Sequence, residues 1–69
     1  MNGNMPITKA DEDLVLRVVQ NNEGKHSDRI IKIISKEANI SLNYAGYLLK
    51  ECVKRNLVAF KGFQVYIEK

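Results

Sequence analysis

Four side chains in the second half of the sequence could act together because of their types and their spacing. Asn43, Tyr47, Lys50 and Lys54 recur at intervals of three or four residues, so in a helix they occupy one narrow sector of its surface. An asparagine amide can hydrogen-bond to adenine, a lysine can pair with guanine or phosphate, and a tyrosine offers a ring and a hydroxyl group. This combination fits a helix lying in the major groove of DNA, which is wide enough to admit one.

The same pattern also occurs on ordinary solvent-exposed helices, and each of these residues, taken alone, more often simply faces solvent. A sharp turn directly before the helix favours the first interpretation. Asn39 can adopt the left-handed conformation that ends a helix, Ile40 can pack beneath the corner, and Ser41 can cap the next helix. Two helices joined by so short a turn are expected to cross as a helix-turn-helix.

The opposite side of this third helix is apolar and should pack against the core. The residues that project near the direction of Leu42 on a helical wheel are Ala45, Leu49, Cys52, Val53 and Asn56, with Leu48 at their border. Cys52 is therefore expected to be a small buried hydrophobic residue and not a redox sensor.

A first helix is expected near the N-terminus. Thr8 can cap it, with Asp11 close to completing a capping box, and Gly24 can supply a left-handed position after its end. Its apolar stripe comprises Leu14, Val15, Val18 and Val19.

A second helix should follow, and Ser27 is predicted to cap it. The β-branched run "IIKII" would also suit a strand, but apolar pairs three and four residues apart favour a helix. Its apolar residues are Ile30, Ile31, Ile33, Ile34 and Ala38, with Arg29, Lys32 and Lys36 on the opposite side.

After the third helix, Asn56 can again adopt a left-handed conformation, and residues 57–69 predict a β-hairpin with a very tight loop at Lys61-Gly62. Lys61 at the tip could reach a backbone phosphate. His26 is expected in a short strand or loop that pairs with this hairpin. The apolar face expected to cover the helices comprises Val58, Phe60, Phe63, Val65 and Ile67, and the other face comprises Ala59, Gln64 and Tyr66.

The length of 69 residues allows one domain, with residues 1–7 as a flexible N-terminal tail and residues 8–69 as the folded part. One cysteine excludes an intramolecular disulfide, and with a single histidine it cannot complete a structural zinc site or a nucleophile–base pair. We therefore expect no enzymatic activity, no metal and no cofactor. The short apolar runs argue against a membrane span, and the free cysteine suits the cytoplasm.

Charge is distributed unevenly along the chain. Residues 1–23 carry two basic and four acidic side chains, whereas residues 24–69 carry nine basic and four acidic ones. Lysines that merely solvate the surface would explain this distribution, and so would a polyanionic partner for one face of the protein.

The chain resembles the winged helix-turn-helix family over roughly residues 8–68. The stretch Ala38-Asn39-Ile40-Ser41 is similar to the family's small-Gly-apolar-Ser turn, with Asn in place of Gly, and "KRNLV" (Lys54–Val58) is similar to the segment that leads into the family's wing. Ala45, Leu49 and Cys52 match its recognition-helix core positions. The resemblance implies a mainly α-helical fold of three helices plus a two-stranded β-hairpin, the wing. It also implies binding of double-stranded DNA through the third helix and the wing.

The sequence departs from the family pattern in three respects. The wing tip is minimal, the expected DNA-reading side holds no arginine, and no helix follows the hairpin to serve as a dimerisation arm. Leu16, which projects away from the apolar stripe of the first helix, is an alternative dimer contact. Two-fold dimerisation would let two third helices enter successive major grooves about 34 Å apart.

The leading hypothesis is therefore a small transcriptional regulator that binds double-stranded DNA, with or without forming a homodimer. The residues expected to contact bases are Asn43, Tyr47 and Lys50. Those expected to contact the DNA backbone are Lys25, Arg29, Ser41, Tyr44, Lys54, Arg55 and Lys61.

The alternative hypothesis is a protein-interaction module of the same fold that modulates a replication, recombination or transcription partner. Its contact surface would comprise Tyr44, Tyr47, Phe63 and Tyr66, because aromatic residues are enriched at protein interfaces.

Overall fold

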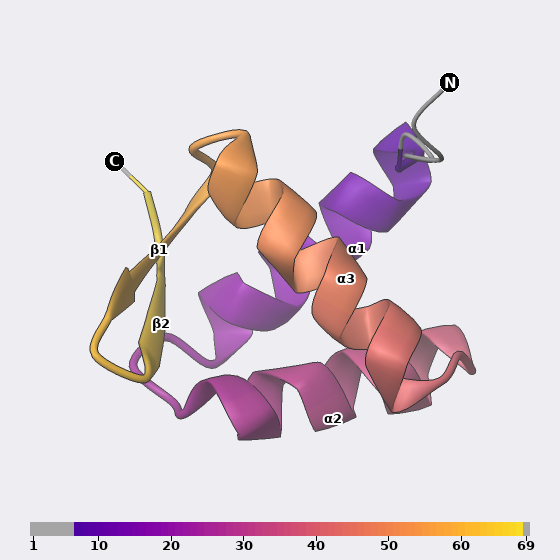
Figure 1. Ribbon diagram of the computed structural model, residues 1–69, viewed down its shortest axis with the longest axis horizontal. Coiled ribbons are helices and arrows are strands. Elements are labelled where there is room, and N and C mark those ends of the chain that lie inside the picture. The colour runs from indigo at the N-terminus through magenta and orange to yellow at the C-terminus, as the bar shows by residue number, and fades with distance from the viewer. Residues whose placement is uncertain (1–6, 69) are drawn as a thin grey trace.

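The computed structural model describes residues 7–68, which form three helices followed by a two-stranded antiparallel hairpin. In Figure 1, α2 runs along the lower edge, α3 crosses in front of α1, and the hairpin lies at the left. The predicted fold class, mainly helical with a small β-hairpin in a winged helix-turn-helix arrangement, is confirmed. The elements are α1 (Lys9–Asn21), α2 (Ser27–Ala38), α3 (Leu42–Lys54), β1 (Val58–Lys61) and β2 (Gln64–Ile67).

The start of α1 has the predicted capping box. The Thr8 hydroxyl accepts a hydrogen bond from the backbone N–H of Asp11 at 3.0 Å, and the Asp11 carboxylate accepts one from the N–H of Thr8 at 3.5 Å. Of the expected tail, only Ile7 is among the described residues, and it is buried in the core. Packing of the domain thus begins before Thr8. Gly24 has the predicted positive φ, at 87°.

The prediction that Ser27 caps α2 is wrong, because His26 is the N-cap and Ser27 is the first helical residue. The His26 Nδ1 atom accepts a hydrogen bond from the N–H of Asp28 at 3.1 Å. The N–H of Ser27 donates instead to the carbonyl of Phe63 in the hairpin, at 2.8 Å. The carbonyl of His26 also accepts from the N–H of Ile30 at 3.1 Å, so the helix begins one residue earlier than predicted.

The "IIKII" run is helical, as the spacing predicted, and Ile30 and Ile34 are fully buried. The following turn is sharp, since Asn39 adopts the left-handed conformation with φ 57°. Ser35 holds the turn in two ways: its carbonyl accepts from the N–H of Ile40 at 3.0 Å, and its hydroxyl donates to the carbonyl of Ile40. Ile40 is half-buried against the core, as expected.

Helix α3 packs against the core through four buried residues. Its N-cap is Ser41, as predicted, with the hydroxyl accepting from the N–H of Tyr44 at 3.1 Å. Leu42 was expected on the packed side, but it is 54% exposed because it lies at the edge of that side, in the first turn. The buried residues of α3 are Ala45, Leu48, Leu49 and Cys52.

The hairpin has a two-residue loop, Gly62-Phe63, which is one residue later than the predicted Lys61-Gly62. Lys61 pairs with Gln64, and Gly62 has a φ of 65°, as required at the first position of a type II′ turn. Phe63 consequently leaves the apolar strand face and is 70% exposed. Phe60 points to the expected face but remains 43% exposed, so only part of that face covers the helices.

Strand β2 also pairs with the segment before α2. His26 forms an isolated antiparallel bridge with Gln64, as the sequence predicted. The N–H of Gly24 donates to the carbonyl of Val65, and the N–H of Val65 donates to the carbonyl of Lys25. These bonds fix the hairpin relative to the start of α2. Together with packing of β1 on α3 and β2 on α1, they give the wing a defined position beside α3.

Candidate nucleic-acid interface

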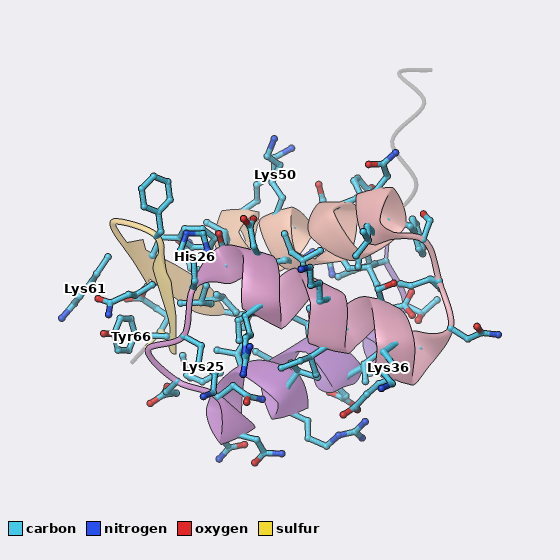
Figure 2. The ribbon with its side chains drawn as sticks, turned by 90° about the horizontal axis from the view of Figure 1, so that it is seen from below. Lys25, His26, Lys36, Lys50, Lys61 and Tyr66 are labelled. Atoms are coloured by element: carbon cyan, nitrogen blue, oxygen red, sulfur yellow. The ribbon has the colours of Figure 1, made fainter. Side chains whose placement is uncertain are left out.

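We use the name α3 face for Asn43, Tyr47, Lys50 and Lys54. Asn43, Lys50 and Lys54 are exposed and project from the side of α3 opposite Ala45 and Cys52, because about 100° separates successive helical residues. In Figure 2, Lys50 projects from the upper edge of the molecule, away from the core. Asn43, Lys50 and Lys54 are thus presented to solvent on the helix that follows the Asn39 corner.

The two tyrosines of α3 differ in exposure. Tyr47 is half-buried and packs against the core, whereas Tyr44 is 36% exposed. Their rings stack with centroids 5.9 Å apart and an interplanar angle of 19°. Only part of Tyr47 is therefore accessible beside the lysines, and its position is constrained by its neighbours.

The cations at the end of α3 have intramolecular partners. The Lys54 ammonium lies 3.4 Å from the Glu51 carboxylate, one helical turn away. The Arg55 guanidinium lies 3.2 Å from the Glu12 carboxylate of α1. Arg55 therefore points toward α1 and would have to leave Glu12 to bind a phosphate. Lys50 forms no ion pair with any of the residues 7–68 that the structure describes.

The hairpin contributes one cation, Lys61, and two exposed rings, Phe60 and Phe63. The Lys61 ammonium lies 5.4 Å from the centre of the Tyr66 ring, a cation–π contact, and Figure 2 shows both at the left of the view, beside the hairpin. Phe63 stacks on His26 with centroids 5.2 Å apart. The aromatic surface expected from the sequence is divided between two parts of the molecule. Tyr44 and Tyr47 lie in the first half of α3, and Figure 1 shows that this helix starts away from the hairpin, which carries Phe63 and Tyr66.

An apolar groove of about 320 Å³ lies beside the α3 face. Sequence reasoning missed this groove because its lining comes from α2, α3 and β1, which only the fold brings together. Gly46 has no side chain to fill it, and a Cβ there would lie 3.7 Å from the Ile31 side chain. The lining residues are Ser27, Ile31, Gly46, Leu49, Lys50, Val53 and Phe60.

Two of the expected backbone-contacting residues lie elsewhere. Lys25 and Arg29 line a groove of ≈ 360 Å³ between the end of α1 and α2, together with Lys32 and Lys36. We call this the basic groove; Asn22 and Ile33 complete its lining. The structure therefore does not bring Lys25 and Arg29 together with the α3 face. Arg29, Lys32 and Lys36 share the side of α2 that the sequence predicted to be polar, and Lys25 precedes the helix.

The buried side of α3 carries no reactive group. Burial raises the pKa of the Cys52 thiol to about 11, and the nearby carboxylate of Glu12 adds to this effect. The thiol is therefore protonated at neutral pH, when only a thiolate would act as nucleophile. Within residues 7–68 no three His, Cys, Asp or Glu side chains gather as they would around a metal ion.

Leu16, considered above as a dimer contact, is half-buried and packs against the core. No helix within residues 7–68 has the length and apolar character needed to cross a membrane. Comparisons with protein-family models, with curated proteins and with solved structures find no match.

Proposed function

We propose that this protein is a small transcriptional regulator of the winged helix-turn-helix family that binds double-stranded DNA in the cytoplasm. The observation that carries the proposal is the line of exposed Asn43, Lys50 and Lys54, on the side of α3 opposite its buried residues and just after a sharp corner. A helix held in this way can enter a major groove while its other side stays packed.

Each residue would contribute according to its chemistry. The Asn43 amide and the Lys50 ammonium would contact base edges, and the accessible part of Tyr47 would contact a base or sugar beside them. Lys54 and Lys61 would bind phosphates at the end of α3 and at the wing. Formation of a homodimer would place two α3 faces in successive major grooves, about 34 Å apart.

A salt-dependent titration tests the proposal. Binding of a fluorescent duplex is measured by anisotropy at several salt concentrations for the wild type and for Lys50→Ala/Lys54→Ala. Because each phosphate contact contributes about 0.9 to the slope of log K against log salt, loss of the Lys54 contact should lower that slope by about 0.9 in the double variant. Its affinity at low salt should fall at least tenfold, on the order of 1.4 kcal/mol.

The matched control is Lys9→Ala/Arg17→Ala, which also removes two exposed positive charges but from α1. A general effect of net charge would weaken both variants equally. Equal affinity of the wild type and the Lys50→Ala/Lys54→Ala protein would contradict the proposed role of the α3 face.

The apolar groove beside Lys50 supports a second candidate function, a protein-interaction module for a replication, recombination or transcription partner. The exposed Phe60 at its edge and the exposed Phe63 nearby would fit an apolar side chain of that partner. Chemical-shift mapping with duplex distinguishes the candidates. Salt-sensitive shifts in α3 and the wing favour DNA, and their absence favours a protein.

A further inference from the structure

The basic groove contains four cations that no acidic side chain neutralises. Lys25, Arg29, Lys32 and Lys36 are all exposed, and none forms an ion pair within residues 7–68. Of the nearby acidic groups, the exposed Asp28 carboxylate lies 3.9 Å from Nδ1 of His26, and the Glu37 carboxylate lies 3.1 Å from Arg17. The Glu23 carboxylate likewise accepts a hydrogen bond from the N–H of Ile67, at 2.8 Å. The groove is therefore free to bind an anionic partner.

The spacing of these cations suits a phosphate backbone. Arg29, Lys32 and Lys36 follow one side of α2 over about 10 Å, because a helix rises about 1.5 Å per residue. Lys25 extends the row beyond the helix start. One DNA strand carries a phosphate about every 3.4 Å along the duplex axis, so this row can contact about three phosphates of one strand.

The groove has few features of a protein-binding surface. Its lining holds no aromatic residue, and Ile33 is its one large apolar residue. Protein interfaces are enriched in aromatic residues and depleted of lysine, particularly at their centres. The composition of the basic groove thus favours a phosphate backbone over an acidic protein.

The basic groove and the α3 face lie on different sides of the molecule. Arg29, Lys32 and Lys36 project away from the buried Ile30 and Ile34, toward the α1 side of α2. Figure 2 shows Lys25 and Lys36 on the lower side of the view and Lys50 on the upper side. A straight duplex on the α3 face would therefore leave the basic groove uncovered.

We propose that the basic groove binds the sugar-phosphate backbone of a second DNA duplex, so that one protein molecule bridges two duplexes. The bridging rests on the proposed function for the first duplex. Contacts in the groove would be electrostatic and independent of base sequence, since lysine and arginine there would reach phosphates only.

A capture assay tests the bridging. A biotinylated 16-base-pair duplex is tethered to beads, protein is added, and retention of a second, fluorescent duplex is measured. The groove variant is Arg29→Gln/Lys32→Gln, and the matched control of equal charge is Lys9→Gln/Arg17→Gln. All substituted side chains are exposed, and amide spectra of each variant verify the fold.

The wild type should retain the fluorescent duplex. The groove variant should still bind the tethered duplex but retain at least tenfold less of the fluorescent one. Amide shift mapping should show two sets of duplex-induced changes in the wild type, one over residues 25–36 and one over residues 43–54. In Lys50→Gln/Lys54→Gln, the changes over residues 25–36 should persist.

Several results would overturn the bridging. Retention of the fluorescent duplex by the groove variant at the wild-type level would assign bridging to a homodimer instead. Shifts in residues 43–54 alone would leave the proposed function intact and remove the second site. Shifts in residues 25–36 alone would contradict both DNA binding by the α3 face and the bridging of two duplexes. Shifts in residues 25–36 with poly-glutamate, but not with duplex, would assign the groove to an acidic protein.

Discussion

The α3 face and the basic groove are both cationic, yet they differ in what surrounds the charges. On the α3 face, the lysines are accompanied by the Asn43 amide, by the stacked tyrosines and by an adjoining apolar groove. In the basic groove, the cations adjoin Asn22 and Ile33 alone, and the Asn22 side-chain amide already donates to the carbonyl of Val18 at 2.8 Å. Discrimination between sequences needs directional hydrogen-bonding groups, whereas charge alone provides affinity. Under the proposed function, the α3 face would therefore recognise sequence, and the basic groove would attach to phosphates through charge alone.

The largest expected effect comes from removing a core residue on which both surfaces depend. Ile34 is fully buried on the packed side of α2, so Ile34→Ala should lower the free energy of unfolding by about 2–5 kcal/mol. For a domain of this size that is a large part of the total stability, and binding at both surfaces should weaken together. Urea denaturation followed by circular dichroism measures the loss.

Ile33→Ala is the matched control, because Ile33 has the same side chain on the same helix but is only half-buried. Ile33→Ala should lower the free energy of unfolding by less than half as much as Ile34→Ala does. Equal losses of unfolding free energy in the two variants would show that Ile33, which lines the basic groove, stabilises the fold as much as Ile34 does. Effects of groove substitutions on binding could then not be separated from their effects on folding.

A second prediction separates recognition from attachment. In duplexes selected from a random pool, Asn43→Ala should reduce the preference for the selected sequence over random sequence by about 1–3 kcal/mol. Arg29→Ala should weaken binding to selected and random duplexes by the same factor. Competition titrations at fixed salt concentration measure both quantities, and a change in sequence preference with Arg29→Ala would reverse the assignment.

The smallest expected effect concerns the corner that orients α3. Asn39 has a φ of 57°, so the β-branched side chain in Asn39→Val should cost about 1–2 kcal/mol of stability. Asn39→Gly should be tolerated, because glycine adopts this conformation readily. At temperatures where both variants remain folded, Asn39→Val should weaken binding by the α3 face more than binding in the basic groove. An Asn39→Val protein as stable as the Asn39→Gly protein would contradict the claim that the positive φ at position 39 disfavours a β-branched residue.

Local signals predicted much of this fold. The capping box at Thr8, the left-handed Asn39 and Asn56, and the Ser41 cap are all present, since each depends on side chains within a few residues. The exposed side of α3 also follows from helical periodicity alone. The Ser27 cap was wrong because His26, which is not among the preferred capping residues, caps α2 through its Nδ1 atom.

The sequence by itself determined three helices, their corner and the line of polar residues along α3, because helix periodicity and capping act over a few residues. Only the tertiary structure decided that Lys25 and Arg29 face away from α3, that Phe60 borders an open groove, and that the hairpin helps to position the start of α2. The physical reason is that a surface is made by neighbours in space. Which residues become neighbours depends on how the helices cross and where the hairpin docks, and local patterns do not encode either.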